Sequence, residues 1–260
     1  MKLTIIGCTG SMSGPESASS SYLVQAPDET GRIWSLLLDI GSGALGALWR
    51  VFPPSQLDAI ILSHMHADHM VDMIGMHVFR RWHPDGPLPP LPVLAPAGAV
   101  ERVRGVAGDP ETETYAGEFT FLEHTPAEPR QIGPFFVESF PVRHPVPAFS
   151  TRITGPSIHP GEQVVLTYSG DTDMCDSLVE SARDADVFLC EAAFREGMDT
   201  VRGIHLTGRR AGQVASTAGP KNLVLTHIQP WTNPHDVLAE TLDVWQGPTA
   251  IAQDGAIWEF

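Results

Sequence analysis

The sequence predicts an α+β protein in which two packed β-sheets are covered on their outer faces by helices. Short apolar runs of strand length recur along the chain, and Gly, Pro, Asp or Ser bounds each of them. Other segments show the 3.6-residue periodicity of amphipathic helices. The first half is richer in strands, whereas helices alternate with strands later. This order is typical of two sheets packed face to face with helices outside.

The expected strands, in chain order, are Lys2–Gly7, Ser20–Ala26, Ile33–Ile40, Ala59–Ser63, Leu91–Ala95, Phe119–Glu123, Phe135–Phe140, Val164–Ser169, Val187–Cys190, Leu223–Thr226 and Ala250–Ala252. The expected helices are Gly43–Val51, His69–Phe79, Ala97–Ala107, Ser177–Arg183, Gly208–Ala218 and Pro234–Gln246. A chain of 260 residues can fill one large domain or two small ones. We expect one domain that spans residues 1–260.

The segment from His83 to Pro96 is the most loop-like part of the chain. It contains six prolines, which neither a helix nor a central strand accommodates. The segment could link two domains, but strand signals resume directly after it, so we expect a surface loop within one domain. A long loop after the histidine-rich motif described below is also a candidate lid.

The composition limits the partners of the protein. There are 16 Lys and Arg against 31 Asp and Glu, which gives a formal charge of −15. The ordinary interpretation of this acidity is that it keeps the protein soluble. An acidic surface also repels nucleic-acid phosphates, so we do not expect a nucleic-acid partner. The three cysteines have no CxxC spacing, and no apolar run is long enough for a signal peptide or a membrane span. We therefore expect a cytoplasmic protein without a membrane partner.

A cluster of metal-ligand residues follows the fourth expected strand. The apolar run ends at Ser63, and His64, His66, Asp68 and His69 come directly after it. Alternate residues of a strand point the same way, so the first two imidazoles share a side. Neutral imidazole and carboxylate are ligands that Zn²⁺, Fe²⁺ and Mn²⁺ accept. A chance His-rich turn is the structural alternative, but this density of ligands favours a metal site.

Further ligands are expected at the ends of later strands. His144, Asp171 and His227 each follow an apolar run, where functional sites are usually built. Each of them alone would more often be structural. Together with the first motif they complete the ligands of a metal site.

These residues belong to a series of motifs along nearly the whole chain: Ile6–Ser11 with Pro15, Ser19–Ser21, Asp39–Gly43, His64–His69, His144, Ser169–Thr172, Cys190–Phe194, His205–Gly208 and Leu225–Ile228. The series resembles the metallo-β-lactamase superfamily, in particular the phosphodiesterase branch that includes ribonuclease Z. The resemblance implies an αββα sandwich of four layers. It also implies two divalent metal ions, with one group of ligands for each and Asp171 as the bridge: His64, His66 and His144 for the first, and Asp68, His69 and His227 for the second.

Glu191 and His205 indicate the chemistry. In the ribonuclease Z-like branch a Glu orients a His that meets the scissile phosphate, and both residues stand at the matching places here. A carboxylate that accepts a hydrogen bond from an imidazole fixes the ring and raises its basicity. A helix-start His bonded locally is the structural alternative. We expect Asp68, Glu191 and His205 to be the catalytic residues.

The expected mechanism follows from charge. Two ions, zinc or else manganese or iron, share a water and lower its pKa, and the hydroxide attacks phosphorus. His205 neutralises charge in the transition state and donates a proton to the leaving alkoxide.

The chain departs from ribonuclease Z in ways that favour a small substrate. Ribonuclease Z has Gly-Glu-Gly-Thr-Gln where this chain has Gly41–Leu45, and an Arg-Tyr pair where this chain has Gln229–Thr232. It also carries a long basic arm that holds tRNA. The matching stretch here, residues 145–170, contains a single Arg, Arg152, and no Lys. The chain is more similar to bacterial cyclic-nucleotide phosphodiesterases without that arm, above all in Leu225–Thr232.

The sequence therefore predicts hydrolysis of a small phosphodiester, with 3′,5′-cyclic AMP as the first choice. The alternatives are a tRNA 3′-processing endoribonuclease and another hydrolase of the same fold, such as a thioesterase or a lactonase. Trp231 is a candidate for stacking on a base, and Arg80 and Arg81 are candidates for binding phosphate. The family resemblance also makes a homodimer an expectation.

Overall fold

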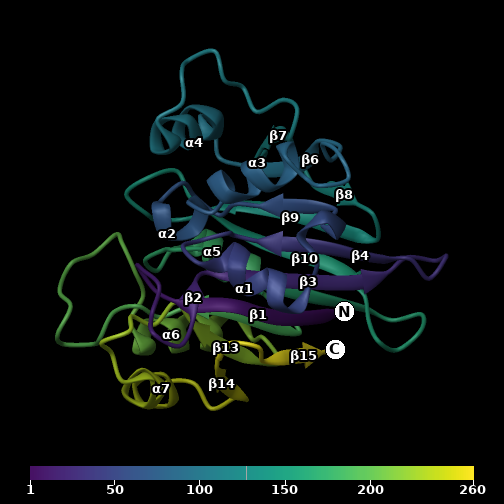
Figure 1. Cartoon of the computed structure of the whole chain (residues 1–260). Helices are drawn as coiled ribbons and strands as arrows, with labels where there is room; N and C mark the ends of the chain where they lie inside the picture. Colours follow the sequence, from purple (N-terminus) through teal and green to yellow (C-terminus); the bar gives the residue numbers. More distant parts are fainter. Residues whose placement is uncertain (127) are drawn as a thin grey trace.

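The protein consists of two β-sheets packed face to face, with helices on both outer faces (Figure 1). The computed structural model describes residues 1–126 and 128–260. The first sheet has the order β15-β1-β3-β4-β5-β6-β7, with β2 paired to β1. Its strands are β1 (Lys2–Thr9), β2 (Ala18–Ser19), β3 (Ser21–Pro27), β4 (Ile33–Leu38), β5 (Ala59–Ile61), β6 (Leu91–Ala95), β7 (Phe119–Glu123) and β15 (Ile257–Glu259).

The second sheet has the order β14-β13-β12-β11-β10-β9-β8. Its strands are β8 (Arg130–Ile132), β9 (Phe135–Pro141), β10 (Phe149–Pro156), β11 (Gln163–Tyr168), β12 (Val187–Glu191), β13 (Leu223–Thr226) and β14 (Thr249–Ile251). The helices are α1 (Ala44–Val51), η1 (Pro54–Gln56), α2 (Ala67–Met70), α3 (Met73–Arg81), α4 (Ala99–Ala107), α5 (Asp176–Ala182), α6 (Gly208–Ala218) and α7 (Pro234–Leu242).

Three hydrophobic clusters correspond to the three interfaces of a four-layer sandwich. One cluster lies between the sheets, one joins the first sheet to α1, α3 and α4, and one joins the second sheet to α5, α6 and α7. Strand β4 contributes side chains to two of these clusters. Leu36 and Leu38 point into the cluster between the sheets, whereas Leu37 points toward the helices. A strand buried on both faces therefore reads as a continuous apolar run. The expected αββα architecture is confirmed.

Parallel pairing brings the carboxyl ends of several strands to one edge of the sandwich. Strands β4, β5, β6 and β7 are parallel neighbours in the first sheet, and β11, β12, β13 and β14 are parallel neighbours in the second. The loops that leave these strands are therefore close together, as in other sheets where ligands bind beyond the carboxyl strand ends.

The helix expected at His69–Phe79 is wrong in one respect, because it is two helices. Helix α2 ends at Met70 and α3 begins at Met73. The Asp72 main-chain N–H donates to Ile40 O, and its carboxylate accepts the Leu45 N–H. The bond to Ile40, in the loop after β4, takes the place of a helical bond of Asp72, while its carboxylate binds the first turn of α1.

The loop expected at His83–Pro96 is wrong in its second half, where Leu91–Ala95 forms β6 as the strand pattern predicted. β6 is a central strand that contains Pro92. β5 pairs only with Val93 and Leu94 of β6, so the missing N–H of Pro92 interrupts no pairing with β5. The first half is attached to α3 by the bond from Leu88 N–H to Arg80 O. A lid role for this half stays a prediction.

Four strands were not expected: β2, β8, β10 and β15. β10 has the sequence FSTRITGP, whose Ser and Thr side chains hide its buried alternation from an apolar pattern. Among the residues that the structure describes, no helix has the length and apolar character needed to cross a membrane.

Gly41 lies against the main chain of α2 and generates a prediction. A Cβ at this position would come within 1.9 Å of Asp68 O. We expect Gly41→Ala to lower the free energy of unfolding by about 1–3 kcal/mol, because the two segments must separate. Gly46 is the matched control, because it lies in α1 with open space around its Cβ position, and its change to Ala should be neutral or stabilising. Urea unfolding of both variants measures the difference, and equal stabilities would contradict the prediction.

Candidate metal centre

All the predicted metal ligands lie at one edge of the sandwich, and each follows the end of a strand. His64 comes shortly after β5 of the first sheet. His144, Asp171 and His227 follow β9, β11 and β13 of the second sheet. The two sheets thus contribute ligands from opposite sides of the interface.

The first group of ligands is formed by three imidazoles: His64, His66 and His144. The His66 Nδ1 lies 3.1 Å from His64 Nε2 and 3.0 Å from His144 Nε2. Nitrogens bound tetrahedrally to Zn²⁺ at about 2.0–2.1 Å lie roughly 3.3–3.4 Å apart. The spacing in this group is therefore close to that of ligands around one ion.

The second group contains two imidazoles and two carboxylates: Asp68, His69, Asp171 and His227. The Nε2 atoms of His69 and His227 are 3.1 Å apart, and both lie 3.2–3.3 Å from Asp68 Oδ2. Asp171 Oδ2 is 3.2 Å from His69 Nε2 and 3.7 Å from His64 Nε2 of the first group. Asp171 therefore lies between the two groups, as a bridging ligand would.

One buried atom tests whether these residues fit a metal ion. Asp171 Oδ1 is buried and accepts no hydrogen bond from any residue that the structure describes. It lies 3.4 Å from His227 Nε2. A buried carboxylate oxygen without a donor is costly unless a cation neutralises it. The residues therefore fit a divalent cation, which imidazole and carboxylate ligands suit.

The electrostatics of the groups agree with that fit. Burial opposes ionisation of Asp171, but the neighbouring His227 and His69 hold the pKa of its carboxyl well below the usual range. Burial also lowers the pKa of His64 well below its usual value, so the ring is neutral and can act as a ligand. For His69, burial is outweighed by Asp171 and Asp39, which raise the pKa well above normal. A cation that binds there replaces that proton.

Asp39 holds the predicted ligand His69, a role that the sequence did not indicate. Its Oδ2 accepts hydrogen bonds from His69 Nδ1 (2.7 Å), Ser63 Oγ (2.7 Å) and Tyr168 Oη (2.8 Å). Its Oδ1 accepts the Ser63 main-chain N–H at 2.7 Å. Asp39 has a positive φ of 56°, a strained conformation for a residue with a side chain. The available signals were a carboxylate directly after the apolar end of β4 and its place in the Asp39–Gly43 motif.

The predicted catalytic pair is also at this edge of the sandwich. His205 Nδ1 donates to Glu191 Oε1 at 2.9 Å, and the same oxygen accepts the Thr172 N–H at 2.9 Å. Burial opposes the charged ring, but Glu191 outweighs it and raises the pKa of His205 to about 9. The His205 ring centroid lies 5.6 Å from that of His144 and 5.3 Å from that of His227. The ring is thus adjacent to both ligand groups.

The predicted substrate contacts are placed differently. Arg80 is buried and donates to Glu118 O and Pro89 O, and Arg81 pairs with Glu113 and Glu118. This bonding is that of arginines with a structural role, and their contact with a substrate stays a prediction. Trp231 is 66% exposed in the loop after His227, so its ring is accessible.

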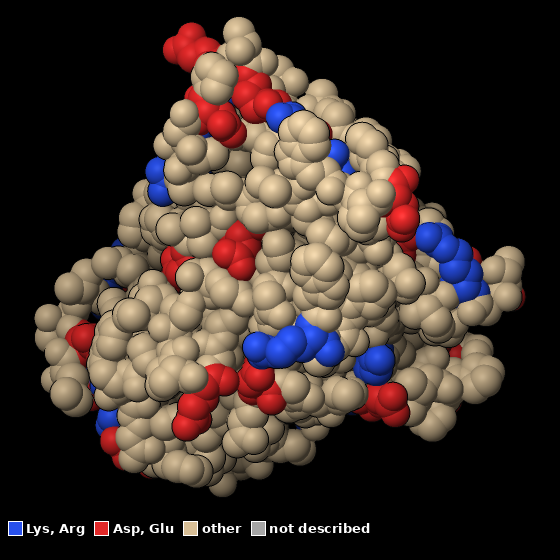
Figure 2. Space-filling view, in the orientation of Figure 1, with Lys and Arg blue, Asp and Glu red and all other residues tan. Residues whose placement is uncertain are grey.

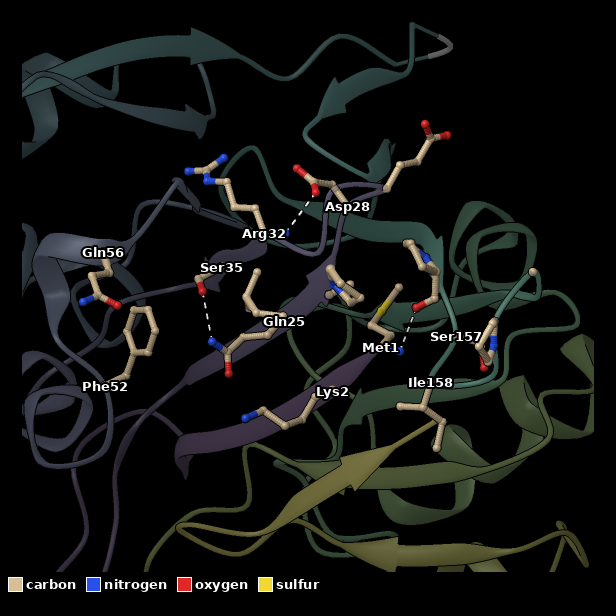
Figure 3. Close-up of a pocket in the computed structure, with 17 residues that line it drawn as sticks. Met1, Lys2, Gln25, Asp28, Arg32, Ser35, Phe52, Gln56, Ser157 and Ile158 are labelled. Atoms are coloured by element: carbon tan, nitrogen blue, oxygen red, sulfur yellow. Dashed lines mark hydrogen bonds between the residues drawn. The ribbon is translucent and has the colours of Figure 1, made fainter.

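A large cavity and the predicted metal ligands lie in different parts of the molecule. A cavity of about 1060 Å³ is lined by Met1, Lys2, Gln25 and Arg32, among others (Figure 3). It lies at the start of β1, whereas Gly10, just after the end of β1, lies against the predicted ligand His227. None of the residues that line the cavity is a histidine. We assign the functional site to the convergent ligands, because volume alone supplies no chemistry.

Loss of the Asp39 carboxylate is expected to weaken metal binding. In Asp39→Asn an amide faces the His69 ring and the Tyr168 hydroxyl, so the ring is no longer held by a charged acceptor. We expect metal affinity to fall by about 10–100-fold. Competition with a chromophoric chelator measures it, with Asp58→Asn as the control, since Asp58 pairs with Arg32 instead. An affinity equal to that of the wild type would show that Asp39 does not support the site.

Comparison with known proteins shows the family. A family model described as the beta-lactamase superfamily domain matches residues 36–228. The chain is 39% identical to an uncharacterized protein of Mycobacterium leprae, over all of this chain and 88% of that protein. It is 31% identical to the probable metallo-hydrolase YhfI of Bacillus subtilis, over the full length of both.

Solved structures agree with this result. The crystal structure of Bacillus subtilis YhfI, described as a metallo-beta-lactamase fold protein, has a TM-score of 0.85 at 29% identity and covers 100% of this chain and 99% of its own. The short form of human tRNase Z has a TM-score of 0.72 at 18% identity, with 100% and 99% coverage, and shares the fold. The chain belongs to the beta-lactamase superfamily and is a metal-dependent hydrolase.

Proposed function

We propose that this hydrolase is a phosphodiesterase that uses two divalent metal ions and acts on a small phosphodiester. We take 3′,5′-cyclic AMP as the first substrate to test and zinc as the first metal, with manganese and iron as alternatives. The observation that carries the proposal is the place of His205. Its ring is adjacent to both ligand groups while its Nδ1 is bound to Glu191.

The ligand groups and His205 have different roles in the proposed reaction. When bound, two divalent ions at these groups would supply electrostatic stabilisation of phosphoryl oxygens and lower the pKa of a water. Glu191 fixes the His205 ring through Nδ1 and leaves Nε2 without a partner among the described residues. The ring then faces a phosphoryl group held between the ligand groups and can give a proton to the leaving oxygen. Its raised pKa favours the protonated ring that this role requires, although nearby cations would lower that pKa again.

The structure supports a small substrate over a folded RNA. Residues 149–168, between His144 and Asp171, form the antiparallel pair β10 and β11. This is where ribonuclease Z carries its tRNA-binding arm. On the face shown in Figure 2, basic side chains are few and scattered among acidic ones. That face therefore offers few positive charges to RNA phosphates.

The similarity to ribonuclease Z keeps tRNA processing as the second candidate. The Myxococcus xanthus ribonuclease Z is 26% identical over 98% of this chain and 96% of its own length. A cytoplasmic location, which three free cysteines suit, and a homodimer also stay predictions. Gel filtration with light scattering distinguishes a dimer from a monomer.

The substrate assay separates these candidates. Zinc- or manganese-loaded protein is incubated with cyclic nucleotides, precursor tRNA, a thioester and a lactone. We expect cyclic AMP to give AMP, and His205→Ala to lower turnover by about 10²–10⁴-fold because proton transfer is lost. His159→Ala is the matched control, since His159 lies in the exposed turn between β10 and β11. Intact cyclic nucleotides, or full activity in His205→Ala, would refute the proposal.

Trp231 is expected to contribute to binding of the base. An exposed indole four residues after the predicted ligand His227 can stack on a nucleobase. Trp231→Ala should raise KM for a cyclic nucleotide, with little change in KM for bis(p-nitrophenyl) phosphate. Trp82→Ala is the control, because Trp82 is also exposed but follows α3. An unchanged KM in Trp231→Ala would remove the indole from the site.

A further inference from the structure

The carboxylate of Asp173 is a buried junction of hydrogen bonds, two residues after the bridging Asp171. Asp173 is completely buried. Its oxygens accept hydrogen bonds from Arg202 Nε (2.7 Å), Arg202 Nη2 (3.1 Å), the Gly203 N–H (2.7 Å), Arg210 Nη1 (2.9 Å) and the Met174 N–H (2.8 Å). The predicted metal ligands do not include Asp173, so its bonds connect chain segments.

Arg210 extends this junction to the main chain of His205. Arg210 lies in the first turn of α6 and is 8% exposed. Its Nη1 donates to Asp173 Oδ1 at 2.9 Å and also to His205 O at 3.1 Å. One nitrogen therefore connects the peptide of His205 to the carboxylate beside Asp171.

The backbone of the same turn holds the segment of another predicted ligand. The Asp173 N–H donates to Arg143 O at 2.8 Å, and the Arg143 N–H donates to Thr172 Oγ1 at 3.1 Å. Arg143 directly precedes His144. The turn of residues 171–173 contains the predicted ligand Asp171 and binds the main chain just before His144. Through Arg210 it also binds the main chain at His205.

Among the described residues, two side chains form hydrogen bonds with His205, and they act on different parts of it. Glu191 holds the ring at Nδ1, which sets the ring orientation. The pair Asp173 and Arg210 holds the carbonyl, which sets where the residue lies relative to Asp171. A ring with the right orientation in the wrong place does not reach a substrate, so both contacts are needed.

We propose that Asp173 and Arg210 are positioning residues, which fix the distance between His205 and the metal-ligand groups. This inference rests on the proposed function, because it assigns His205 the role of meeting the phosphoryl group. Loss of Arg210 removes the side-chain donor to His205 O and one of the three donors to Asp173 Oδ1. The segment that carries His205 then moves toward water, while Glu191 keeps its hold on the ring.

The kinetic test is a double-mutant cycle on the metal-loaded enzyme. Arg210→Met keeps much of the side-chain volume and removes both hydrogen bonds. We expect kcat to fall by about 100-fold, the effect of a displacement on the ångström scale, with KM changed little. In the His205→Ala background, Arg210→Met should cause no further loss, because the group that it positions is gone.

A control and a second variant exclude general destabilisation. Arg152 is a similar arginine whose Nη1 donates to Ser181 O and Arg183 O, away from residues 195–210. Arg152→Met should therefore leave kcat unchanged. If Arg210→Met does not fold, Arg210→Lys replaces it, since it keeps a charge near Asp173 with a single nitrogen. A smaller loss of kcat is then expected, again only where His205 is present.

A readout independent of turnover separates this inference from the proposed function. In protein labelled with ¹⁵N-histidine, the ring resonances of His205 should shift or broaden in Arg210→Met and stay in place in Arg152→Met. This holds even if the wild type hydrolyses no phosphodiester, an outcome that refutes the proposed function alone. Unmoved His205 resonances, or equal losses of kcat with and without His205, would overturn the inference.

Discussion

The structure depends on one electrostatic constraint: buried carboxylates and imidazoles are held about 3 Å apart where the two sheets meet. Asp171 is buried, and its Oδ1 accepts no hydrogen bond from the residues that the structure describes. The histidine nitrogens around it point at one another. Such a cluster is stable only with positive charge at its centre. Either a proton on a ring such as His69 or a cation supplies it, and a cation satisfies all the ligands together.

The surrounding chain is organised to maintain this cluster. Asp39 and His227 both adopt positive φ angles, of 56° and 57°, at the ends of buried strands. Gly10 allows the second of these, because a Cβ there would come within 2.1 Å of His227 O. Backbone strain of this kind persists only where neighbouring contacts determine the conformation. Local conformational cost is thus concentrated at the residues that hold and orient the ligands.

The sequence predicted which residues would come together at one site, because their signal is local. His64 to His69 form a dense motif, and later ligands each follow an apolar run that proved to be a strand. The residues that support the ligands were harder to find. Most side-chain partners of Asp39, Asp173 and Arg210 are distant in sequence, so the sequence alone did not indicate which groups these residues hold. Strand β10 was missed for a related reason, since its buried face is lined partly by Ser and Thr.

The ligands come from both sheets, and this has a consequence for the life of the protein in a cell. An ion bound by these predicted ligands would cross-link the two sheets, which could then not separate without losing it. Binding to the native state alone adds stability that grows with the logarithm of free ion concentration. When metal is scarce, the protein opens more often and quality-control proteases gain access. The supply of metal would then determine the amount of the protein in the cell as well as the fraction of it that is active.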